Sequence, residues 1–421
     1  MNYLLFFFYG VLFCWWLVRL PFIKRAGLNR QTVILLFLLK IAAGVSIGWL
    51  SVHYYSTGND YWDVNREGWK EYRLFWTDPK EYFSNIFHSG YSNGYAGIFD
   101  SFQSFWNDLK NNLVIKMVSV FDFFSGGNYY INSLFFNFFI FFGHVALYRV
   151  FIKIYQGQAF RVIIGCFLLP SMLYFTSGIH KDGIVFWMLA LFIYALYFSL
   201  TETRVSVKRI VVLLISLLLL FFTRNFVLIA LIPALTAWVV SVKMKWPVIL
   251  TFAGVYVVSG LLFFNLHAFF PAFDPLGSIV QKQSDFLVLP HAVTGIDLDP
   301  LHPGFMSFLH NAPQAFNHLL IRPYLTELPS PILLPANIEL LLYQLLFVLF
   351  LFFQRKKEPF NKEPMIVFAV FFTLTAFLFI GYIVPNLGSL VRYRSLYLPF
   401  LVTPLLCQTN WKKVQYLIKI K

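Results

Sequence analysis

Three short segments of the sequence carry charged residues at spacings that could do chemistry. In the first segment, Asp60, Asp63 and Glu67 follow one another at intervals of three and four residues. A helix that begins at Asp60 would place all three carboxylates on one face. Clustered carboxylates raise one another's pKa, and one of them could then act as a general base. The alternative is structural, with Asp60 capping the helix and the other two complementing its dipole.

The second segment is a short charged turn between two apolar runs, with the sequence Ser177-Gly178-Ile179-His180-Lys181-Asp182. Charge between two membrane spans is costly unless it is paired or binds a ligand. Lys181 could hold a phosphate while Asp182 fixes the position of the ammonium group. A capped turn with a local ion pair is the alternative interpretation.

The third segment places Arg392, Tyr393 and Arg394 directly before an apolar run that contains Pro399. An arginine fork binds phosphate oxygens in pairs, so a lipid phosphate is the natural anionic candidate here. Contact with ordinary lipid headgroups, or pairing with acidic residues of the loops, is the alternative.

The composition indicates what kind of fold must position these segments. Of the 421 residues, 59% are hydrophobic and 12% are charged, whereas ordinary soluble domains have about 45–50% and about 25%. These values predict a polytopic membrane protein and exclude a disordered chain. The net charge of +14 is spread along the sequence, which argues against a nucleic-acid partner.

Apolar runs suited to cross a bilayer recur along the whole chain, and they predict an all-α integral membrane protein with about 11 transmembrane helices in one domain, 1–421. Arg224 and Asn225 separate two of the shorter runs. The predicted spans are 2–20, 31–52, 129–152, 159–176, 183–200, 210–222, 225–241, 247–265, 338–353, 364–384 and 395–408.

The loop charges predict the orientation of these helices. Alternate connections carry 20 of the 33 lysine and arginine residues but only three of the 19 acidic residues. By the positive-inside rule that side is cytoplasmic, so the N-terminus lies outside and the C-terminus inside. Two large loops, 53–128 and 266–337, then lie outside.

Both outer loops contain a segment with a helical apolar stripe. In 101–124, Phe102, Leu109 and Leu113 share one side, while Lys110 and Lys116 lie on the other. Such a helix lies on the membrane surface, or it packs on the outer part of the protein itself. The stretch 305–320 is a second case, interrupted by Pro313.

These segments resemble the C-type (GT-C) glycosyltransferase superfamily and the related EpsG-like and Wzy-like polysaccharide polymerases of bacteria. The resemblance rests on an acidic motif that opens a large outer loop, and on late arginines before Pro399. It also rests on the turn from Ser177 to Asp182, which is similar to the S-G-x-x-K-[ED] turn of EpsG-like proteins. One departure is that the acidic loop follows the second predicted helix, where typical GT-C enzymes have it after the first.

The resemblance implies a bacterial plasma-membrane enzyme that transfers a sugar or oligosaccharide, with inversion, from a polyprenyl-phosphate or polyprenyl-diphosphate donor to an outer-leaflet glycan or lipid acceptor. Asp60 would be the general base, with Asp63 as the reserve candidate. Cationic groups would neutralise the phosphate as it leaves. The substrate-binding residues implied are His180, Lys181, Asp182, Arg392, Tyr393 and Arg394.

The same resemblance bears on cofactor use, and two other functions fit the sequence. Some relatives need a divalent cation, and Asp60, Asp63 and Asp182 would be its ligands here; no other cofactor is expected. A transporter or flippase of lipid-linked glycans would use the same arginines, although the internal repeats typical of transporters are not visible. A non-catalytic scaffold of an envelope polysaccharide assembly complex is the other rival.

Overall fold

A computed structural model describes residues 2–54, 59–90, 105–203, 206–271, 274–289, 293–327, 331–355 and 362–419. Within these ranges the regular elements are helices, joined by two isolated β-bridges. The predicted all-α class is confirmed. The expected helix residues 101–104, including Phe102, lie outside the described residues.

Seven described helices are long and apolar enough to cross a membrane, so the chain is a helical membrane protein. The number of spans remains a prediction, since α1 (Tyr3–Leu17) and α18 (Leu398–Gln408) are shorter apolar helices. The seven are α3 (Arg30–Tyr54), α7 (Tyr129–Ile154), α10 (Lys181–Thr201), α11 (Val207–Met244), α12 (Val248–Phe269), α15 (Leu334–Phe352) and α16 (Pro364–Ile383).

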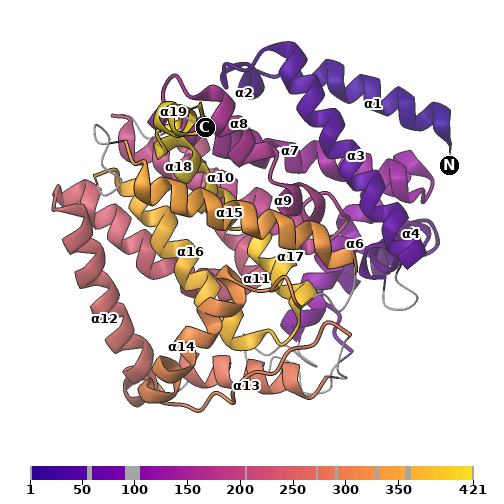
Figure 1. The fold of residues 1–421 in the computed structure, drawn as a ribbon. Coiled ribbons are helices and arrows are strands. Elements are labelled where there is room, and N and C mark those ends of the chain that lie inside the picture. The colour runs from indigo at the N-terminus through magenta and orange to yellow at the C-terminus, as the bar shows by residue number, and fades with distance from the viewer. Residues whose placement is uncertain are drawn as a thin grey trace.

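The centre of the bundle is formed by α7, α10 and α16, whose spans are mostly buried, whereas α12 is largely exposed. The N-terminal helices and α12 lie on opposite sides of the bundle (Figure 1). The predicted span 159–176 is instead two helices, α8 (Ala159–Phe167) and α9 (Pro170–Phe175). Pro170 occupies the first turn of α9, where its missing N–H costs nothing.

The longest helix, α11, is broken at Arg224, whose φ of −154° and ψ of 76° are not helical. A straight helix of its 38 residues would be about 57 Å long, nearly twice the hydrocarbon thickness of about 30 Å. Arg209 pairs with Glu202 at the end of α10, and Arg224 pairs with Asp182 at its beginning. The first half of α11 therefore runs antiparallel to α10.

The second half of α11 returns across the bundle. Asn225 shares a cavity with Tyr382 at the end of α16, and the Trp238 ring lies 4.7 Å from that of Phe368 near its beginning. Arg392, which follows α16, pairs with Asp182 at the beginning of α10, so these two helix ends lie at the same level. Helix α11 therefore folds back at Arg224. The sequence predicted a boundary between two spans at this position.

The remaining elements gather mainly at the end of the bundle where Arg224 lies. Helix α6 packs on α4 and α7 through apolar side chains such as Val114 and Val118, so it lies on the protein itself. Helix α14 continues through Pro313, where the sequence predicted an interruption. These elements are α4 (Asp60–Thr77), α5 (Pro79–Ser84), α6 (Phe105–Ser125), α13 (Pro275–Leu287), α14 (Phe305–Leu320) and α17 (Leu387–Ser395).

Candidate functional site

The charged turn between α9 and α10 forms the floor of the candidate site. His180 is the N-cap of α10, and Asp182 lies in the first turn of that helix, where the dipole favours a carboxylate. Gly178 allows the ring of Tyr61 to approach the turn, because a Cβ at this position would lie 2.5 Å from Cε1 of the tyrosine. Helix α4 is thereby held directly against the turn.

Asp182 is the central counter-ion of the site. Its side chain is only 1% exposed. Oδ1 lies 2.6 Å from Nη2 of Arg224, and Oδ2 lies 3.4 Å from Nε of Arg392. Two arginines from α11 and α17 are thus fixed by one buried carboxylate, which offsets the cost of burying all three charges.

His180 lies between Asp182 and the acidic residue that begins α4. Nδ1 of His180 lies 2.9 Å from Oδ2 of Asp182, so it donates its proton to that carboxylate. Burial lowers the pKa of His180 although Asp182 opposes this effect, and we infer that the ring is neutral at pH 7. Nε2 is then unprotonated, and it lies 4.0 Å from Oδ2 of Asp60.

Asp60 is the first residue of α4 and stands at the rim of the site. Asn59 occupies the cap position, so Asp60 is a residue of the first turn and not the cap. Its side chain is 56% exposed, and Oδ2 lies 3.5 Å from Nη1 of Arg392. Asp60 is therefore accessible from solvent and also contacts Arg392, which pairs with the buried Asp182. Asp63 instead pairs with Arg66 on the exposed side of α4.

Five cationic side chains, which we call the cation cluster, converge on this place from five helices. Burial, Lys181 and Arg224 lower the pKa of Lys110 to about 8. Burial lowers the pKa of Lys282 as well, and Lys110, Arg224 and Lys181 add to the effect. Such mutual repulsion would be relieved by a bound anion. The members of the cation cluster are Lys110, Lys181, Arg224, Lys282 and Arg392.

Tyr393 lies beside the cation cluster. The guanidinium carbon of Arg224 is 4.0 Å from its ring centroid, and Nη2 of Arg392 is 3.3 Å from its hydroxyl oxygen. Burial acts to raise the pKa of Tyr393, but Arg392 and Arg224 more than offset this and lower it. The hydroxyl group is thus a good hydrogen-bond donor for an anion.

Six of the eight predicted site residues meet here: Asp60, His180, Lys181, Asp182, Arg392 and Tyr393. Arg394 does not join them, because its buried guanidinium donates to the carbonyl oxygens of Leu319 and Arg322. Asp63 does not join them either.

Three members of the cation cluster were not among the predicted site residues. The helical stripe in 101–124 placed Lys110 on the polar side, yet its side chain is buried. Arg224 was recognised only as a charge between two spans. Lys282 had no signal of its own, since nothing in the sequence relates α13 to α10.

The predicted cation ligands are not gathered. In the described part of the chain, no group of three or more His, Cys, Asp or Glu side chains is arranged to hold a metal ion. Asp182 and Asp60 both face Arg392, a cation, while Asp63 faces Arg66 on the exposed side of α4.

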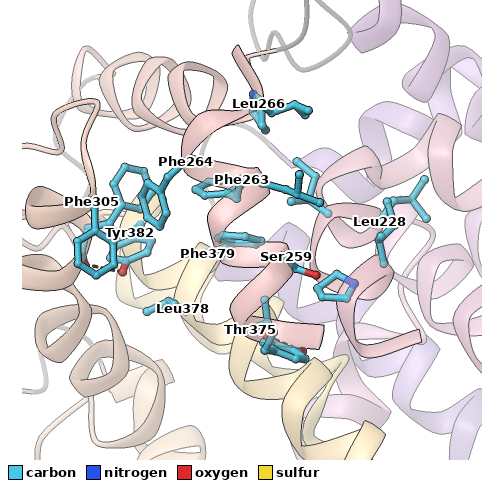
Figure 2. A pocket seen from close by; sticks show the side chains of 18 of the residues that line it. Leu228, Ser259, Phe263, Phe264, Leu266, Phe305, Thr375, Leu378, Phe379 and Tyr382 are labelled. Carbon is cyan, nitrogen blue, oxygen red and sulfur yellow. Dashed lines mark hydrogen bonds between the residues drawn. The ribbon is translucent and has the colours of Figure 1, made fainter. Parts of the chain in front are cut away.

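An apolar cavity of about 630 Å³ lies beside the cation cluster, between the second half of α11 and helices α12, α14 and α16. Figure 2 shows the rings of Phe264, Phe305 and Tyr382 close together at one side of the cavity and Leu228 on the other. Asn225, the residue after Arg224, also lines it. One end of the cavity is therefore lined by the residue that directly follows Arg224.

No protein-family model, curated protein or solved structure matches this chain. The function is accordingly inferred from the site itself.

Proposed function

We propose that the chain is a membrane glycosyltransferase or polysaccharide polymerase of the bacterial plasma membrane. It transfers a sugar or oligosaccharide from a polyprenyl-phosphate or polyprenyl-diphosphate donor to an outer-leaflet acceptor. In this proposal the cation cluster faces the outside and the C-terminus the cytoplasm, as the loop charges favour.

The cation cluster is the observation that carries the proposal. Five cationic groups meet Asp182, which is buried, and Asp60, which is half exposed, while Asp285 acts on Lys282. Positive charge is therefore in excess. An apolar cavity adjoins this charge. A lipid phosphate combines an anionic group with a hydrocarbon chain, and it matches both regions at once.

Asp60 is the proposed general base. Its carboxylate takes the proton of the acceptor hydroxyl while the hydroxyl oxygen forms a bond to the anomeric carbon of the donor sugar. The bond from that carbon to the phosphate oxygen breaks on the opposite face, so the configuration inverts and the electron pair leaves with the phosphate. Lys181 and Arg392 stabilise the negative charge that grows on the leaving group.

His180 and Asp182 position this machinery. Asp182 fixes Arg392 and the imidazole, and the imidazole places an uncharged nitrogen beside Asp60. Because the ring carries no positive charge, it does not bind the Asp60 carboxylate as a counter-ion. The cation next to the Asp60 carboxylate is therefore Arg392 and not the imidazole.

The test is sugar transfer by the purified full chain in detergent, from a radiolabelled polyprenyl-linked sugar to a glycan acceptor. The proposal predicts transfer that falls strongly in Lys181→Ala and persists in Lys116→Ala. Lys116 lies on α6 and pairs with Glu71, so it is the matched control. Movement of the labelled lipid across sealed vesicles without transfer would favour a transporter, and neither activity would favour a scaffold.

A further inference from the structure

The apolar cavity continues along α12 into a second cavity of about 600 Å³. The two cavities share Ile232, Ser259 and Leu262 as lining residues. The second one extends to Trp246 and Pro247, at the opposite end of α12 from the cation cluster. The two neighbouring cavities lie along the second half of α11 and α12, and we call them together the α11–α12 groove.

We propose that the α11–α12 groove holds the hydrocarbon chain of the lipid phosphate whose anionic group lies on the cation cluster. The inference rests on the proposed function and specifies where its donor lies. The occupant is a lipid with a single long chain, and its affinity should then depend on the length of that chain.

Continuity with the cation cluster supports this occupant. Asn225 lines the groove and directly follows Arg224, and Pro275 lines it as the first residue of α13, the helix that carries Lys282. Nζ of Lys282 lies 3.8 Å from the ring centroid of Phe226. The headgroup end of the groove is therefore lined by the residue after Arg224 and by the first residue of the helix that carries Lys282.

The lining and the size of the α11–α12 groove suit a hydrocarbon. Apolar side chains such as Leu228, Leu262 and Phe379 provide most of its wall. An engineered apolar cavity of about 150 Å³ accommodates a benzene molecule, so a cavity of about 630 Å³ has room for several isoprene units. A chain in such a groove gains contacts that water would not supply.

The groove is open toward the bilayer. Ile232 is 60% exposed and Leu262 is 54% exposed, although both line the groove and both lie in membrane-spanning helices. Leu309 on α14 is also more than half exposed. A lipid can thus enter sideways from the membrane, with its headgroup arriving at the cation cluster.

Glycines of α12 allow the groove to be blocked at two depths. A Cβ added at Gly260 or at Gly254 meets no heavy atom within 4 Å, so a larger side chain fits without a backbone clash. Gly260 lines the first cavity and Gly254 the second. Leu261, which is 62% exposed and lines neither cavity, is the matched control.

The experiment measures binding of a short and a long polyprenyl phosphate, and of inorganic phosphate, to the purified full chain. Gly260→Trp should weaken binding of both lipids by at least about tenfold. Gly254→Trp should weaken only the long one, and Leu261→Trp neither. Unchanged binding of inorganic phosphate shows that each variant is folded. If Gly260→Trp does not fold, Gly260→Leu is used in its place to block the groove.

Three results would overturn the inference: equal affinity of the wild type for both lipids and inorganic phosphate, unaltered lipid binding in Gly260→Trp, or equally strong competition by a two-chain phospholipid. Failure of the proposed function is distinguishable. If binding depends on chain length but no sugar is transferred, the groove binds lipid and the proposed enzymatic function is wrong. If sugar is transferred but binding does not depend on chain length, the enzymatic function holds and the groove is not the lipid site.

Discussion

Among single residues, Asp182 is the one on which the geometry of the site depends most. Its buried carboxylate faces Arg224, Arg392 and His180. Removing the charge would leave Arg224 without its counter-ion, and Arg392 with only the half-exposed Asp60. Losses of this kind are far larger than those of an exposed pair.

Replacing Asp182 by Asn should therefore lower the free energy of unfolding by about 3–5 kcal/mol. Asp63→Asn is the matched control, because its half-exposed carboxylate pairs with Arg66 on the surface; we expect a change within about 0.5 kcal/mol. Denaturation of both variants in detergent measures the difference. Similar small changes in the two would contradict the central role of Asp182.

The lowered pKa of Lys110 predicts how the binding of a prenyl phosphate depends on pH. Burial and its cationic neighbours lower its pKa to about 8, so it is charged below that value and loses its charge as the pH rises through it. A prenyl phosphate is largely ionised above about pH 7. Its affinity should accordingly fall by up to about tenfold as the pH rises from 7 to 9.5.

The variant Lys110→Arg isolates this effect, since arginine stays charged throughout the range. Its affinity for a prenyl phosphate should fall less than that of the wild type, because Lys282 still titrates, whereas Lys116→Arg should retain the full wild-type decline. A decline of the same size in Lys110→Arg would assign the titration to another group.

At the scale of the elements, the charged turn and α4 are joined at Gly178. An alanine there would bring its Cβ to 2.5 Å from the Tyr61 ring, and the ring would have to move. Because Asp60 precedes Tyr61 on the same turn of α4, any such movement displaces the proposed base from Arg392 and His180.

Gly178→Ala should cost about 1–3 kcal/mol in the free energy of unfolding and lower sugar transfer. Gly254→Ala is the control, because its new methyl group meets open space and α12 gains helix propensity. Thermal unfolding and transfer should be compared in the two variants. Full transfer by Gly178→Ala would show that Tyr61 need not hold its position.

The sequence predicted most elements but not all of their contacts. Apolar length and periodicity define the long helices, and the polar pair at Arg224 marks the break in α11, because these are local properties. The burial of Lys110 and its proximity to Lys282 depend on how α6 and α13 pack, which has no local signature. Arg394 lies close to Arg392 in the sequence, yet it donates to the backbone carbonyls of Leu319, in the last turn of α14, and of Arg322, just after that helix.

At the scale of the whole molecule, the account depends on orientation. The basic loops favour a C-terminus in the cytoplasm, and the cation cluster then lies at the outer edge of the membrane, where an outer-leaflet acceptor would be found. Positive charge at that edge departs from the usual distribution, which a lipid phosphate would explain.

Cysteine labelling of intact cells tests this orientation. In a chain whose three cysteines are replaced by alanine, Ser84→Cys should react with a membrane-impermeant maleimide in intact cells. Lys412→Cys should react only after lysis. Both side chains are exposed, so accessibility does not limit the reaction. The reverse pattern would place the cation cluster in the cytoplasm and exclude an outer-leaflet acceptor.

The most direct test of the central claim is single-turnover sugar transfer from a polyprenyl-linked donor by Asp60→Asn and Asp63→Asn, with donor binding measured in the same samples. Asparagine keeps the size of the side chain but removes its ability to take a proton. The account predicts a loss of about 10²–10⁴-fold in rate for Asp60→Asn, with donor binding retained, and near-normal transfer by Asp63→Asn. Collapse in Asp63→Asn alone would move the role to that residue, and normal transfer by both variants would contradict a catalytic function for this part of the chain.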